Sequence, residues 1–67
     1  MNMLDAKAIR EIRLSLGMTQ TEFAVAIGKS YPAVCKWEAG LRHPTYATML
    51  KINELAQKAA TKQKQAV

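Results

Sequence analysis

Apolar residues recur at helical spacing in four segments of the chain, and glycines and polar residues separate these segments. In the first segment, Ile9, Ile12 and Leu16 lie three or four positions apart, which places them on one face of a helix. The Asp5 carboxylate can cap the start of this helix, and Gly17 suits the position just beyond its end. The pattern therefore predicts a first helix between these two residues.

The second segment begins with an explicit start signal. The Thr19 hydroxyl can accept from the backbone N–H of Glu22, whose carboxylate can reach back to the Thr19 N–H, and this is a capping box. Gly28 ends the segment because it can adopt the positive φ that a tight turn between helices needs. Ala24 lies midway along this helix, where a small side chain lets the next helix cross closely.

The third segment is predicted to be a helix held to the core by one face. Ser30 can cap it, and Pro32 is tolerated because a first-turn N–H has no partner within the helix. Val34 and Trp37 lie three positions apart on one face, and Gly40 closes the helix. Because these two apolar residues face the core, the opposite face must point outward.

Thr45 can cap a fourth helix. Its inward stripe is expected to comprise Met49, Ile52, Leu55 and Ala56. Beyond Gln57 the apolar pattern fades, so residues 58–67 are predicted to be a basic helix extension or a flexible tail. The fold class is therefore a compact all-α domain of four or five helices, over residues 1–57.

Length and charge narrow the range of functions that the chain could have. A chain of 67 residues forms one domain, with little room for both a core and a buried enzyme pocket. The 10 Lys and Arg exceed the 5 Asp and Glu, and the net charge of +5 weakly favours a polyanionic partner such as nucleic acid.

The sequence offers few residues that could bind a metal, form a disulfide or carry out catalysis. One cysteine, Cys35, excludes an internal disulfide, and with one histidine, His43, the chain cannot build a cysteine-based zinc site. We therefore expect no metal, no cofactor and no enzymatic activity. The sequence has no apolar run of membrane-spanning length and no signal-peptide pattern, so we expect a cytoplasmic protein with no membrane contact.

Several positions together match a known pattern. They are Leu16-Gly17-Met18-Thr19-Gln20-x-Glu22-Phe23-Ala24, Ile27-Gly28-Lys29-Ser30, Val34-x-x-Trp37-Glu38-x-Gly40 and Pro44. On these residues, the stretch from Ile9 to Leu55 resembles the helix-turn-helix family of phage Cro and repressor proteins, the XRE family. The resemblance covers about two-thirds of the chain and implies a Cro-like fold that binds double-stranded DNA.

The resemblance also implies roles for individual residues. Base reading would fall to Tyr31, Pro32, Cys35 and Lys36, on the outward face of the third helix. Phosphate contacts would come from Gln20, Lys29, Ser30, Arg42, His43, Thr45 and Tyr46. Structural roles would fall to Ala24, Gly28, Val34, Trp37 and the pair Arg13 and Glu38, which matches a salt bridge in some family members.

The chain departs from the family at the reading face. Tyr31, Pro32 and Cys35 stand where phage repressors commonly carry amide side chains, and neither Pro32 nor Ala33 can hydrogen-bond a base through its side chain. Ala39 replaces a polar residue that often touches phosphate. Direct base reading is therefore expected to be sparse.

The resulting hypothesis is a sequence-specific regulator of transcription, a repressor of phage, plasmid or bacterial genes. It would act as a homodimer on an operator that is an inverted repeat. Two alternatives stay open: an antitoxin whose main partner is a toxin protein, and a helix-turn-helix module that binds only protein.

Overall fold

The computed structural model describes residues 5–66 of the chain. Its helices are α1 (Ala6–Ser15), α2 (Gln20–Ile27), α3 (Tyr31–Glu38) and α4 (Tyr46–Ala66). The described residues form no strand, which confirms the predicted all-α class, with four helices and no fifth. No helix in this part of the chain combines the length and the apolarity needed to cross a membrane.

The first two helices begin at their predicted caps. The Asp5 carboxylate accepts from the Ala8 N–H at 2.8 Å, ahead of α1. Before α2, the Thr19 hydroxyl accepts from the Glu22 N–H at 3.1 Å, and the Glu22 carboxylate accepts from the Thr19 N–H at 2.9 Å. The capping box is therefore complete, and the start of α2 is determined by local sequence.

The turn from α2 to α3 depends on Gly28, which has a φ of +71°. An L-residue with a side chain rarely adopts this conformation, so glycine is required at the point where the chain reverses. The Ser30 hydroxyl then caps α3 by accepting from the Ala33 N–H at 3.2 Å. Pro32 occupies the second helical position, where its missing N–H costs nothing.

The core lies where the four helices meet. Its buried members are Ile9, Phe23, Ala24, Ile27, Val34, Trp37 and Ile52. Helix α3 packs against both α1 and α2, and α4 joins this cluster against α2. Ala24, Val34 and Trp37, expected to be structural, are each buried, and the exposed fraction of Ala24 is 2%. The outward face of α3 follows from this packing.

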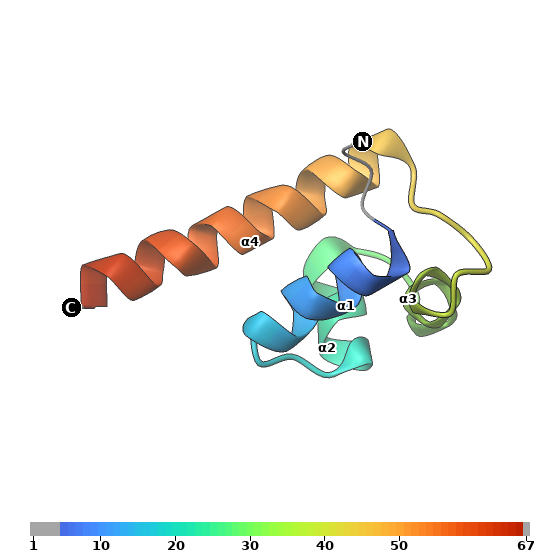
Figure 1. The fold of residues 1–67 in the computed structure, drawn as a ribbon, viewed down its shortest axis with the longest axis horizontal. Helices are drawn as coiled ribbons and strands as arrows, with labels where there is room; N and C mark the ends of the chain where they lie inside the picture. Colours follow the sequence, from blue (N-terminus) through green and yellow to red (C-terminus); the bar gives the residue numbers. More distant parts are fainter. Residues whose placement is uncertain (1–4, 67) are drawn as a thin grey trace.

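Helix α4 is a single long helix that projects beyond the other three at its C-terminal end (Figure 1). Ile52 is fully buried and Leu55 packs against the core, so the first turns anchor the helix. The proposed division between residues 1–57 and 58–67 falls inside this helix, which runs to Ala66.

Candidate nucleic-acid interface

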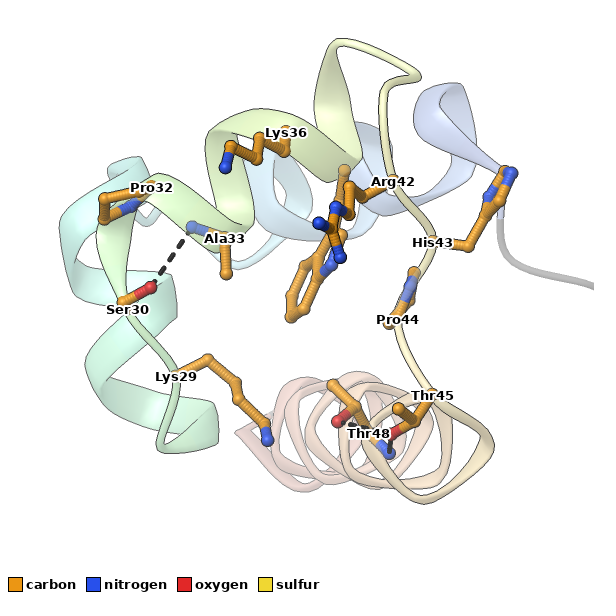
Figure 2. Close-up of a pocket in the computed structure, with 11 residues that line it drawn as sticks. Lys29, Ser30, Pro32, Ala33, Lys36, Arg42, His43, Pro44, Thr45 and Thr48 are labelled. Atoms are coloured by element: carbon orange, nitrogen blue, oxygen red, sulfur yellow. Dashed lines mark hydrogen bonds between the residues drawn. The ribbon is translucent and has the colours of Figure 1, made fainter.

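An open groove of about 400 Å³ lies between the start of α3, the loop that follows α3 and the start of α4 (Figure 2). Its rim carries Lys29, Lys36, Arg42 and His43, and the described residues that line it include no acid. We call it the cationic groove. Lys29, Lys36 and Arg42 are exposed, and none forms an ion pair with a described residue.

The basic side chains approach this space from different elements. In Figure 2, the Lys29 side chain extends toward α4, and the Arg42 guanidinium hangs from the loop into the groove. The His43 imidazole projects away from α3, on the far side of the loop. Three cationic side chains on separate walls create a positive potential that favours a polyanion along the groove.

The interior of the cationic groove is less polar than its rim. Pro32, Ala33, Trp37 and Pro44 contribute apolar surface. At the end formed by α4, the Thr45 hydroxyl donates to the Thr48 hydroxyl at 3.0 Å and accepts from the Thr48 N–H at 3.3 Å. This pair fixes the first turn of α4 against the loop.

The groove brings together most of the residues expected to contact DNA. They are Lys29, Ser30, Pro32, Lys36, Arg42, His43 and Thr45. Outside its lining lie Gln20, Tyr31, Cys35 and Tyr46. Tyr31 and Tyr46 are exposed nearby, at the first positions of α3 and α4.

Gln20 and Cys35 are turned toward each other. The Cys35 thiol donates to Gln20 Oε1 at 3.7 Å, and Gln20 Nε2 donates to Glu38 Oε1 at 3.1 Å. Cys35 is half-buried, and this hydrogen bond directs its sulfur toward α2. Hydrogen bonding with the Cys35 side chain, and then the charge of that side chain, raises the pKa of the exposed Tyr31 hydroxyl. Gln20 thus joins the second helix to the third.

The Arg13–Glu38 pair expected from the resemblance is present and has two-point geometry. Arg13 Nε donates to Glu38 Oε2 at 2.7 Å, and Arg13 Nη2 donates to Glu38 Oε1 at 3.1 Å. Arg13 Nη1 also donates to the Met18 carbonyl at 2.9 Å. The side chains are only 13% and 2% exposed, so this is a largely buried bidentate pair. It fixes α3 relative to α1.

Opposing effects set the pKa of the Glu38 carboxyl. Burial alone would raise this pKa, but hydrogen bonds from Arg13 and Gln20, with the charges of Arg13 and Arg10, outweigh burial and lower it. The hydrogen bond to Glu38 in turn raises the pKa of Arg13. Both groups are therefore charged at neutral pH.

The structure adds residues that the sequence reasoning missed. Arg10 lies 3.7 Å from the Glu38 carboxylate and donates to the Glu38 carbonyl at 3.3 Å. Its position three residues before Arg13, on the same side of the helix, is the signal that could have revealed it. Ala33 and Thr48 line the cationic groove, but no local signal marks them, because the groove forms only when the loop and α4 are in place.

The chemistry of the site is that of a binding surface. Across the described residues, no three His, Cys, Asp or Glu side chains gather where they could hold a metal ion. The side chains of the cationic groove are donors, cations and apolar groups, which suit phosphate oxygens and base edges.

The two short helices joined by a Gly28 turn, with α3 exposed beside a cationic groove, define a DNA-binding helix-turn-helix domain. Residues 9–60 match a family model described as helix-turn-helix, and the chain belongs to this family, the Cro and repressor type also called XRE. Members are DNA-binding regulators of transcription and are typically not enzymes. No curated protein matched the chain.

Proposed function

We propose that this protein is a sequence-specific repressor that reads the major groove of double-stranded DNA with helix α3. The observation that carries the proposal is the cationic groove, where Lys29, Lys36 and Arg42 surround the exposed first turns of α3. A repressor of this kind acts in the cytoplasm of a bacterial host, where phage, plasmid and chromosomal operators are found.

The position of each residue relative to α3 indicates whether it contacts a phosphate or a base. Lys29 and Arg42 lie on the elements that flank α3, where the DNA backbone passes when a helix enters the major groove. Gln20, at the first position of α2, has a second amide N–H left for a phosphate after its bond to Glu38. Base reading falls to the outward residues of α3, above all Lys36.

The salt dependence of binding tests the electrostatic part of this proposal. We expect log affinity for an operator duplex to fall linearly with log salt, with a slope of about −0.9 for each phosphate neutralised. Lys29→Ala and Arg42→Ala should each flatten this slope by about 0.9 and weaken all sequences alike. Fluorescence anisotropy with a labelled duplex at several salt concentrations measures both quantities.

Lys7→Ala is the matched control, because Lys7 is exposed on α1 and lies outside the cationic groove. It should leave the slope unchanged. An affinity independent of salt, or equal slopes for Lys7→Ala and Arg42→Ala, would rule out the cationic groove as the DNA surface.

A single α3 contacts too few base pairs to specify an operator, so the protein acts as a homodimer on an inverted repeat. Half-site centres should lie about 10–10.5 base pairs apart, one turn of DNA. The candidate interface is the part of α4 that projects beyond the core (Figure 1). Truncation after Gln57 should give a monomer by sedimentation, with weakened operator binding.

The untruncated chain in which Lys58, Lys62 and Lys64 are replaced by alanine is the control for the truncation, since it removes charge but keeps the length of the chain. It should remain dimeric. If the truncated chain dimerises and binds the operator normally, the interface lies on another surface.

A further inference from the structure

Pro32 and Ala33 place an apolar surface in the first turn of α3, inside the cationic groove (Figure 2). Pro32 is exposed and has no backbone N–H, and the Ala33 N–H is already bonded to the Ser30 hydroxyl at 3.2 Å. Neither residue therefore has a donor left for a base. This surface can recognise DNA only through van der Waals contact.

In the major groove, the apolar group that such a surface can recognise is the 5-methyl group of thymine. The other groups on the base edges are hydrogen-bond donors or acceptors. Against Pro32 and Ala33 these groups would lose their bound water without gaining a hydrogen-bond partner. An apolar first turn thus favours thymine at the base pair that it faces.

The position of Lys36 sets the distance to the next base that α3 reads. Pro32 and Lys36 are four positions apart on one face of α3, so their Cβ atoms are separated by about 5–6 Å. Successive base pairs are about 3.4 Å apart, and the long lysine side chain adds about one more step of reach. A guanine bound by Lys36 is therefore one to three base pairs from the base that faces Pro32.

We propose that Pro32 and Ala33 are specificity-determining residues, which hold a thymine methyl group one to three base pairs from the guanine that Lys36 contacts. This inference rests on the proposed function, since it needs α3 to lie in the major groove. Lys29 and Arg42 approach the groove from opposite sides and hold the DNA backbone, so the methyl group is pressed against the apolar surface.

Substitution of thymine by deoxyuridine tests this inference directly, because it removes the methyl group and leaves base pairing unchanged. The operator is first obtained by selecting bound duplexes from a random pool with the full chain. Each thymine is then replaced singly, and affinity is measured by anisotropy. We expect binding to weaken about fourfold at one thymine in each half-site, within three base pairs of a guanine, with little change elsewhere.

The double variant Pro32→Ser with Ala33→Ser should lose this discrimination, with a thymine-to-uracil affinity ratio near one. Ala39→Ser is its matched control, since Ala39 is exposed at the end of α3 and outside the groove, and it should keep the ratio of the unmodified protein. If the double variant fails to fold, the substitutions in DNA still decide the question with the unmodified protein.

The outcomes distinguish failure of this inference from failure of the proposed function. If a sequence is selected but no thymine near a guanine responds to loss of its methyl group, the inference is wrong while the proposed function stands. An unchanged ratio in a folded double variant would likewise overturn it. If no sequence is enriched from the pool, the proposed function fails, and this inference fails with it.

Discussion

Replacing Arg13 with alanine should destabilise the domain by about 3–5 kcal/mol, because the Glu38 carboxylate would stay buried without its bidentate partner. A domain of this length has a free energy of unfolding of only about 3–10 kcal/mol, so much of the protein would unfold at physiological temperature. Urea denaturation followed by circular dichroism measures the loss.

Arg10→Ala supplies a control on the same carboxylate. Arg10 lies 3.7 Å from Glu38 but is 55% exposed, so its removal should cost only about 0–1 kcal/mol. A double-mutant cycle of Arg13→Ala with Glu38→Ala should show strong coupling, since the second substitution removes the buried carboxylate that the first deprives of its bidentate partner. Equal costs for the two arginines, or absence of coupling, would show that burial does not govern the energetics of this network.

The same network predicts that the domain becomes less stable at acidic pH. The pKa of Glu38 is lowered by folding, so its contribution is fully present above the pKa of the unfolded chain and is lost as pH falls through the folded value. The Glu38→Gln variant should therefore lose less stability between neutral and acidic pH than the unmodified protein.

The helices were predictable because their start signals are local. The capping box of Thr19 and Glu22 and the glycine at position 28 act over three or four residues, and the structure has them where the sequence indicated. The inward residues Val34 and Trp37 follow from their spacing, and the outward face of α3 follows from them.

The contacts between helices were less accessible to sequence reasoning. The outward position of Cys35 suggested a base contact, but its thiol is bonded to Gln20, fifteen residues away in sequence. Which way a half-exposed side chain turns depends on the crossing of α2 and α3, and periodicity does not specify this crossing. Ala33 could not be assigned to the site from the sequence for a similar reason. The groove that it lines is formed jointly by α3, the loop that follows α3 and the start of α4.

Specific recognition should depend most on one exposed side chain. Lys36→Ala is expected to weaken binding to the preferred operator by about 1–3 kcal/mol, which is roughly 5- to 150-fold, and to relax the choice at one base position. The reason is that Lys36 is the one long cationic donor on the outward face of α3, and lysine can donate to guanine O6 and N7. Anisotropy with the operator and with a random duplex measures the two affinities.

Lys36→Arg is the conservative control, since arginine also donates to guanine and should keep the preference that alanine loses. Thermal stability should hardly change in either variant, because Lys36 is exposed and has no ion-pair partner among the described residues. Equal weakening of operator and random DNA by Lys36→Ala would make Lys36 a phosphate contact. Base reading would then fall to Tyr31 and to the apolar first turn of α3. Neither carries a charge that could read a guanine.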